Sequence, residues 1–281
     1  MISAMRFQPL VAAVVAALLL GAAGCGHDGP AGKGPDCVGG ALPTRQAGKM
    51  VFATDQPADP PWYIDDDPAD GRGFESALAF AVAERLGYPA DRVAWVRVPF
   101  TTAMAPGAKA FDAALSQFSI TDQRRQVVDF SSPYYDVVQA VVTVGTSPAA
   151  TVTTAMGLRP LRLGAYVGTT SAMAARALST NPITVFNSTA ESAVALSNRQ
   201  VDALVIDLPT ARNLTVEMPD VRILGQLPHT PGSTEQLAVM LDKDSPLTGC
   251  VSDAIDGLRS DGTLERLQRQ WIPPISVPVL N

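Results

Sequence analysis

From residue 49 onward, strand-like and helix-like segments alternate regularly, and this alternation restricts the possible folds most strongly. Short apolar runs typical of strands include "MVFAT", "LRLGAYV" and "DALVI", and longer amphipathic runs such as "GFESALAFAVAERLG" separate them. Such a pattern favours α/β sheets with crossover helices. In open α/β sheets, ligands gather beyond the carboxyl ends of strands. The segments that follow the strands are therefore the first candidates for a functional site.

Local signals predict where several helices begin and end. Gly87 follows the first amphipathic run and suits the position after a helix. Ser188 and Glu191 have the spacing of a capping box. In "DSPLTGCVSDAIDGLR", Ser245 and Pro246 are expected as the N-cap and first residue of a helix. The run "DGTLERLQRQW" predicts a last helix near the C-terminus.

Composition excludes several classes of function. A chain of 281 residues that is 47% hydrophobic can bury a full core, as one large domain or two small ones. Its net charge of −6 argues against nucleic acid and anionic membrane surfaces as main partners. We find no zinc-ligand spacing, no G-x-S-x-G elbow and no Walker A loop, since "GPAGKGPD" lacks the required Ser or Thr. We therefore expect no metal and no cofactor.

The N-terminus predicts export. The apolar run 10–20 is shorter than the roughly 20 residues of a bilayer-spanning helix, so residues 1–24 are interpreted as a signal peptide. Cys25 follows "GAAG" and resembles the cysteine of a bacterial lipobox, with Ala22 in place of the usual Leu. We expect Cys25 to carry lipid, the alternative being an ordinary signal peptide with Cys25 removed or left unmodified. The Gly/Pro-rich stretch 25–48 is expected to be a flexible tether, outside the cytoplasm and held to the membrane through lipid only.

Two cysteines, Cys37 and Cys250, remain in the mature chain. Outside the cytoplasm such a pair is bonded more often than free. A Cys37–Cys250 disulfide would join the tether to a C-terminal helix. Catalytic or metal-binding use is disfavoured, because the histidines His27 and His229 lie far from both cysteines along the chain.

The stretch "SITDQRRQVVDFSSPYYDV", residues 119–137, contains the components of an anion site. Arg124 offers a planar fork that matches a carboxylate, and Ser119 adds a hydroxyl and a backbone N–H. Further along, "GTTS" places Thr169 and Thr170 at a helix N-terminus, where free N–H groups and the helix dipole favour negative charge.

Asp207, at the end of the strand "DALVI", supplies the opposite charge and suits an ammonium group. A guanidinium that binds a carboxylate, facing a single aspartate that binds an ammonium group, is what an α-amino acid zwitterion requires. Considered singly, Arg124 is better explained as a surface residue, Thr169 or Thr170 as a helix cap and Asp207 as a turn former. Their joint occurrence at strand ends of one chain favours a binding site.

These segments resemble the solute-binding proteins of polar amino acid ABC importers (bacterial extracellular solute-binding proteins, family 3). The pattern runs in order through "ATD…PPWY…DGRGFESALAFAVAERLG", "FDAALSQFSITDQRRQVVDFSSPYY", "LGAYVGTT", "QVDALVIDLP" and "LRSDGTLERLQRQW". The resemblance implies the type II periplasmic-binding fold, an α/β architecture of two lobes. Each lobe would be an open sheet flanked by helices, and two crossover strands, near residues 136–138 and 233–237, would join them. Lobe 1 would comprise 49–138 and 233–281, and lobe 2 would comprise 139–232.

The resemblance also implies roles for individual residues. The spacing Ser/Thr-x-Thr-x-x-Arg assigns the carboxylate fork to Arg124 and leaves Arg125 at the surface. The expected ligand contacts, from carboxylate to side chain, are Ser119, Arg124, Thr169 and Thr170, then Asp207 for the α-amino group, and Asp55, Phe100, Gln117 and Tyr166 around the side chain. For Trp62, a pocket wall and a core or surface role remain alternatives.

The chain departs from the family pattern around the ligand's side chain. The aromatic residue between Asp55 and the "PP" pair is missing, and Ala58 and Asp59 stand there, apparently with one residue inserted. Gln117 occupies a place often held by Gly or Ser, and Tyr166 a place where some members carry a basic residue. With Asp55, these residues suggest a polar ligand side chain, that of glutamine, glutamate, asparagine or aspartate.

The expected mechanism is hinge closure around an amino acid, which docks first on Arg124 and is then delivered to ABC permease subunits. The protein is expected to be monomeric and not an enzyme. The alternative is a lyase on the same fold, resembling a cyclohexadienyl dehydratase that acts on arogenate or prephenate. It would need a general acid in the cleft; Asp55 and Asp207 already have binding roles, and Glu235 is the nearest remaining candidate. A ligand-presenting sensor is a third possibility.

Overall fold

The computed structural model describes residues 37, 42–228 and 234–281. The predicted signal peptide (1–24), the lipidation of Cys25 and most of the tether (25–48) lie outside these residues. Within the described part of the chain, none of the helices is both long and apolar enough to span a membrane.

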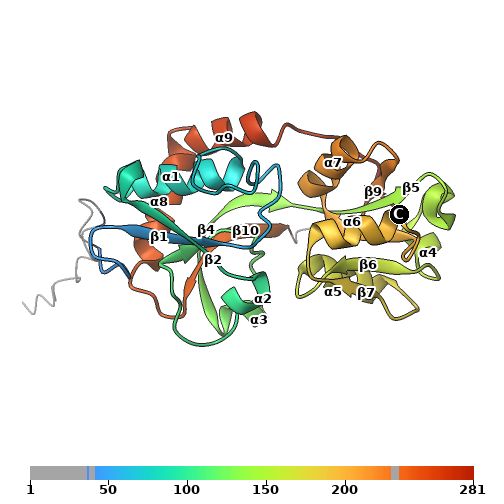
Figure 1. Cartoon of the computed structure of the whole chain (residues 1–281), viewed down its shortest axis with the longest axis horizontal. Helices are drawn as coiled ribbons and strands as arrows, with labels where there is room; N and C mark the ends of the chain where they lie inside the picture. Colours follow the sequence, from blue (N-terminus) through green and yellow to red (C-terminus); the bar gives the residue numbers. More distant parts are fainter. Residues whose placement is uncertain (1–36, 38–41, 229–233) are drawn as a thin grey trace, which may run out of the picture. The chain divides into compact units, whose positions relative to one another are not determined.

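Strands and helices alternate along the chain, as the sequence predicted (Figure 1). The strands are β1 Met50–Thr54, β2 Val93–Arg97, β3 Ala113–Ala114, β4 Val128–Val137, β5 Gln139–Val144, β6 Leu163–Tyr166, β7 Thr184–Phe186, β8 Ala203–Asp207, β9 Val221–Gln226 and β10 Glu235–Asp242. The helices are α1 Phe74–Arg85, α2 Phe100–Ala103, α3 Asp122–Arg125, α4 Ala155–Leu158, α5 Thr170–Leu178, α6 Thr189–Ser197, α7 Leu208–Glu217, α8 Thr248–Ser260 and α9 Thr263–Trp271, with 3-10 turns η1 Ala90–Arg92 and η2 Pro148–Thr151.

The strands form two mixed sheets. The first has the order β2-β1-β3-β10-β4 and the second the order β7-β6-β8-β5-β9. In the first sheet β1 is parallel to β2 and β3, whereas β10 is antiparallel to β3 and β4. The chain leaves the first sheet at the end of β4 and enters the second at β5, and it returns between β9 and β10. This arrangement confirms the expected fold class, two open sheets flanked by helices and joined by two crossovers (Figure 1).

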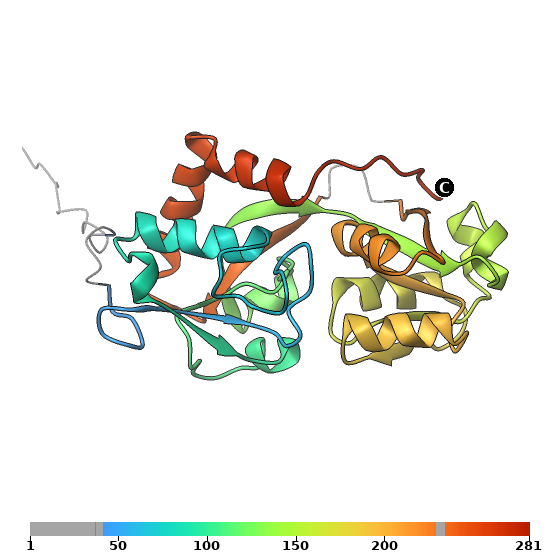
Figure 2. The ribbon, with the colours of Figure 1, turned by 45° about the horizontal axis from the view of Figure 1, so that its top comes forward.

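Both faces of each sheet are buried, because successive side chains of a strand point to opposite faces. In β1, Met50 and Phe52 pack with the helices α1, α8 and α9, whereas Val51 and Ala53 pack with Phe100 on the other face. Figure 2 shows α1, α8 and α9 gathered on one side of the first sheet. This double burial explains why the strands read as continuous apolar runs rather than as alternating ones.

Several local predictions are confirmed and others are corrected. Gly87 follows α1 with a φ of 83°, as expected for a residue after a helix. The Oγ of Ser188 accepts a hydrogen bond from the backbone N–H of Glu191, but the Glu191 carboxylate accepts from Asn187 rather than from Ser188 itself. Helix α8 begins at Thr248, two residues later than Pro246 predicted, because the Ser245 hydroxyl caps a preceding turn by accepting from Leu247.

The C-terminal segment differs from the predicted lobe division. Residues 233–281 were assigned to lobe 1, but Ile275 and Val277 pack against the core of the second sheet, and Leu280 is buried there. The Leu280 N–H donates to the Gln226 carbonyl of the edge strand β9, at 2.9 Å. An edge strand offers unpaired backbone groups, so this apolar tail finds partners on the second sheet. The remaining lobe boundaries stay a prediction.

Cys37 and Cys250 form a disulfide, as the sequence predicted. It closes a loop of 213 residues and joins the N-terminal segment to α8. Replacing both cysteines by serine should lower the free energy of unfolding by about 2–5 kcal/mol, because the unfolded chain gains freedom. Urea denaturation of the two proteins checks this. In a thiol count on the denatured, unreduced mature chain, neither Cys37 nor Cys250 should react, and two reactive thiols at these positions would contradict the bond.

Candidate functional site

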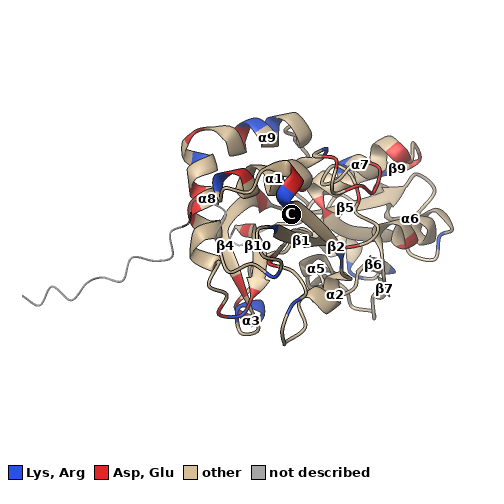
Figure 3. Ribbon diagram, turned by 60° about the vertical axis from the view of Figure 1, so that its left-hand side comes forward, with Lys and Arg blue, Asp and Glu red and all other residues tan. Residues whose placement is uncertain are grey.

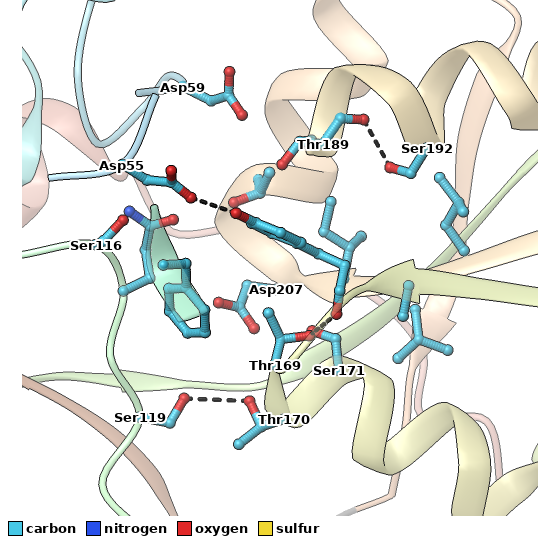
Figure 4. Close-up of a pocket in the computed structure, with 18 of the residues that line it drawn as sticks. Asp55, Asp59, Ser116, Ser119, Thr169, Thr170, Ser171, Thr189, Ser192 and Asp207 are labelled. Atoms are coloured by element: carbon cyan, nitrogen blue, oxygen red, sulfur yellow. Dashed lines mark hydrogen bonds between the residues drawn. The ribbon is translucent and has the colours of Figure 1, made fainter. Parts of the chain in front are cut away.

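One cavity is lined by residues from the strand ends of both sheets (Figure 4). It brings together the nine residues that the sequence singled out, Asp55, Phe100, Gln117, Ser119, Arg124, Tyr166, Thr169, Thr170 and Asp207. Their roles as ligand contacts remain predictions, but their common cavity shows that four distant stretches of the sequence meet at one place.

Arg124 is held in position by the protein backbone. The Thr121 side chain caps the short helix α3 by accepting from the Arg124 N–H at 3.1 Å. The guanidinium donates to the Ser119 carbonyl at 2.6 Å and to the Gly168 carbonyl, which precedes α5, at 3.1 Å. It also lies over the Phe100 ring, 5.5 Å from its centroid. Arg124 is buried, whereas Arg125 is exposed, which agrees with the expected division between them.

Three hydroxyl and carboxyl groups meet beside Arg124. The Ser119 and Thr170 hydroxyls both donate to one carboxylate oxygen of Glu235, at 2.6 and 2.5 Å. Ser119 lies after β3, Thr170 begins α5 and Glu235 begins β10 after the return crossover. Burial lowers the pKa of Arg124, and the nearby charges of Glu235 and Asp207 oppose that shift. The site therefore contains both signs of charge.

Asp207 lies at the end of β8 and is oriented by a network that sequence reasoning missed. Gln139 donates from Nε2 to Asp207 at 2.7 Å and to Glu235 at 3.0 Å, and Ser171 donates to the Gln139 side-chain oxygen at 2.6 Å. Loss of hydration raises the pKa of Asp207 to about 7, the charge of Glu235 adds to this, and Gln139 and Arg124 oppose it. The only sequence signal was a polar residue, Gln139, opening an otherwise apolar strand.

A second contact joins the two sheets on the other side of the cavity. The Tyr166 hydroxyl, at the end of β6, donates to the Asp55 carboxylate, which follows β1 (Figure 4). The other Asp55 oxygen accepts from the Gln56 N–H at 2.7 Å. Burial and the negative charge of Asp55 raise the pKa of Tyr166, so its hydroxyl remains a donor.

The side chains of Gln117 and Thr169 are engaged by the protein itself. Gln117 adopts a positive φ of 51° and donates through its backbone and side-chain amides to Glu75, at 2.8 and 2.9 Å. Burial raises the pKa of Glu75 to about 7. The Thr169 hydroxyl caps α5, accepting from Ala172 and donating to the Tyr166 carbonyl. Both residues line the cavity. The Thr169 hydroxyl is committed to the cap, whereas the Gln117 side chain keeps its amide oxygen and a second N–H for a ligand.

Of the roles considered for Trp62 (a pocket wall, the core or the surface), the structure shows the core. It is fully buried, packs against Phe74 and Tyr135, and donates from its ring N–H to the Thr210 hydroxyl at 3.0 Å. Because Thr210 belongs to α7, this bond is a further link between elements of the two sheets. Trp62 is not among the residues that line the cavity.

Further polar residues that line the cavity were not assigned to the site from the sequence, although Asp59 was noted there as a departure from the family pattern. Asp59 belongs to the loop after β1, and Thr189 and Ser192 belong to the first turns of α6. The motif at the start of α6 indicated a helix cap, but nothing in the sequence shows toward which cavity a helix end points. Within residues 37, 42–228 and 234–281, no cluster of three or more His, Cys, Asp or Glu residues could hold a metal ion.

The two sheets and their double crossover define the type II periplasmic-binding class of proteins. Residues 50–274 match the family model described as bacterial extracellular solute-binding proteins, family 3. This chain therefore belongs to that family, as its motifs predicted.

Known relatives and solved structures agree with this assignment. The L-arginine-binding protein of Pseudomonas aeruginosa is 28% identical over 82% of this chain and 91% of its own length. The arginine-, lysine-, histidine-binding protein ArtJ of Geobacillus stearothermophilus is 25% identical over 82% of this chain and 96% of its own, with a TM-score of 0.68. The ancestral amino acid-binding protein AncCDT-1, a precursor of cyclohexadienyl dehydratase, is 25% identical over 79% and 94%, with a TM-score of 0.66.

Proposed function

We propose that this protein binds a polar α-amino acid outside the cytoplasm and delivers it to an ABC importer. The observation that carries the proposal is that Arg124, in the helix α3 between two strands of the first sheet, and Asp207, at the end of β8 in the second sheet, line one cavity. The guanidinium suits the ligand's carboxylate and the aspartate suits its ammonium group. The names of the relatives, all amino acid-binding proteins, support the same class of ligand.

The proposed mechanism is hinge closure between the two lobes. Contacts such as Tyr166 with Asp55 and Arg124 with the Gly168 carbonyl join elements of different sheets. A ligand that contacts both lobes binds the closed state better than the open one and therefore shifts the population toward closure. The closed form would then be recognised by the permease. The proposal includes a monomer that is attached to the membrane through lipid on Cys25, which mass spectrometry of the mature chain would test.

The test is a thermal-shift and calorimetric screen of the common L-amino acids. A true ligand at a hundred times its dissociation constant should stabilise the fold by about 2.7 kcal/mol. The same compound with its carboxylate amidated, or with its amino group acetylated, should give no shift, because each change removes one of the two charges. If no amino acid binds, the proposed function is wrong.

A lyase activity is the second candidate, and one observation favours it. The Glu235 carboxylate lies against the Ser119 and Thr170 hydroxyls, beside the proposed carboxylate site, where a general acid would be needed. Incubation with arogenate and detection of phenylalanine tests this reading. Turnover that disappears in Glu235→Gln would establish the enzyme, whereas binding of amino acids without turnover supports transport.

A further inference from the structure

The loop between Asp55 and the Pro60–Pro61 pair carries an acid where the resemblance led us to expect an aromatic residue. Asp59 lines the cavity and is partly buried. Its backbone carbonyl accepts from the Trp62 and Tyr63 N–H groups at 3.2 and 3.1 Å, which fixes the turn. In Figure 4, Asp59 and Asp55 lie on one side of the cavity and Ser119 and Thr170 on the opposite side, with Asp207 between them.

We propose that Asp59 is a specificity-determining residue that selects an amino acid whose side chain carries a positive charge. This inference rests on the proposed function. A ligand with its carboxylate near Arg124 and its ammonium group near Asp207 directs its side chain toward Asp55 and Asp59. An acidic side chain would be repelled there, so the glutamate and aspartate suggested by the sequence are disfavoured.

The charges around Asp59 support this assignment. Asp55, Asp66 and Glu217 all act on it with negative charge. The neighbouring cation, Arg97, is already engaged by the Asp66 carboxylate and the Asp55 carbonyl, at 2.7 and 2.6 Å.

Among the described residues that line the cavity, Arg124 is the one Lys or Arg, and it contacts Ser119 and Gly168 rather than Asp59. The Asp59 end of the cavity therefore has negative charge without a matching cation. This is the environment in which a guanidinium or ammonium group of a ligand is best stabilised.

The protonation of Asp59 should make the binding of a cationic side chain depend on pH. Burial, followed by the three nearby acids, raises its pKa to about 6, and hydrogen bonding to Thr189 opposes the rise. The Tyr166 hydroxyl, the remaining titratable group nearby, stays protonated since its pKa is raised. Asp59 is therefore ionised at pH 8 and largely protonated at pH 5, and a cationic side chain should be bound better at the higher pH.

The experiment compares L-arginine with L-citrulline, its uncharged isostere, by calorimetry on the wild type and on Asp59→Asn. We expect wild type to bind arginine about tenfold or more tightly than citrulline. Asp59→Asn should lower this ratio severalfold, because one of the two acids at this end of the cavity loses its charge. Glu217→Gln is the matched control, because Glu217 is an exposed nearby acid that does not line the cavity. It should keep most of the preference.

Measurements at pH 5 and pH 8 complete the design. The arginine-to-citrulline ratio should rise with pH in the wild type and much less in Asp59→Asn, whereas effects on the shared α-amino group cancel in the ratio. Equal binding of arginine and citrulline, or a ratio unchanged in Asp59→Asn, would overturn the inference while leaving amino acid binding intact. Failure of every amino acid to bind would instead reject the proposed function.

Discussion

Arg124→Ala should weaken amino acid binding by about 30- to 4,000-fold. Truncating one partner of a buried, hydrogen-bonded charge pair costs about 2–5 kcal/mol, and much of that cost is the penalty of the charge left without a partner. Here the ligand's carboxylate would be left in a cavity that still contains Asp207 and lies beside Glu235. Calorimetry with the best ligand of the screen measures the effect.

Arg125→Ala is the matched control for this variant. Arg125 is the next residue of α3, but it is exposed, and its guanidinium lies 6.0 Å from the Phe130 ring centroid rather than in the cavity. Its removal should leave the affinity unchanged within about twofold. Arg124→Ala also removes donors to the Ser119 and Gly168 carbonyls, so its unfolding curve must be recorded to show that it folds. If both variants bind like the wild type, the assignment of the ligand's carboxylate to the Arg124 guanidinium is wrong.

Affinity should rise steeply with pH through the range in which Asp207 titrates. In the unliganded protein its pKa is raised to about 7, so at pH 5 about 1% of the molecules hold it as the carboxylate that an ammonium group requires. The affinity at pH 5 should therefore be roughly 100-fold weaker than at pH 8 for a ligand with an uncharged side chain. Citrulline or glutamine is the suitable probe, since Asp59 then contributes little.

Asp207→Asn separates this effect from other titrations. The variant should lose both the tight binding and the pH dependence, while Gln139 can still donate to the asparagine oxygen. The stability of the unliganded protein should depend on pH in the opposite direction to the affinity for the ligand. Because the folded-state pKa lies above the ordinary 3.8, the unliganded wild type keeps a proton that the unfolded chain has lost, so its stability falls as pH rises from about 4 to 7.

The same variant therefore gives a second readout without ligand. Relative to the wild type, Asp207→Asn should gain stability between pH 5 and pH 8, measured as the difference between the two melting temperatures. Glu75 and Asp59 also titrate in this range, with pKa values of about 7 and 6. Both proteins contain them, so the difference removes their own titrations and keeps only the effect of the Glu75 charge on Asp207. A difference that is independent of pH would show that Asp207 does not carry a raised pKa.

The outer helices of the first sheet carry charged side chains of both signs. In Figure 3 both signs of charge appear on α8 and α9. Arg269 pairs with Glu265 within α9, and Arg259 pairs with Asp256 within α8. Such exposed pairs contribute little stability. The opposite charges of functional interest lie instead in the cavity.

Much of the fold followed from local sequence patterns. Strands buried on both faces must be apolar throughout, and helices that cover them must have one apolar side, so residues 49–271 could be read as α/β without any knowledge of contacts. The predicted start of α8 was wrong because Ser245 is equally suited to cap a turn or a helix, and in the structure it caps a turn. The prediction that the C-terminal tail belongs to lobe 1 was wrong because Leu280 pairs with the edge strand β9, and no local sequence pattern indicates where that strand lies.

The candidate site also combines residues that the sequence predicted with residues that only the fold revealed. Arg124, Ser119 and Asp207 were identifiable because their residue types and motifs follow strand ends. The network through Gln139 and Glu235, and the acidic end of the cavity at Asp59, emerged only from the folded chain. The types of segment and the chemistry of single side chains are encoded locally, through periodicity and functional groups. Which side chains share a cavity, and with what pKa, depends on packing between segments that lie from 42 to 116 residues apart, and that packing exists only in three dimensions.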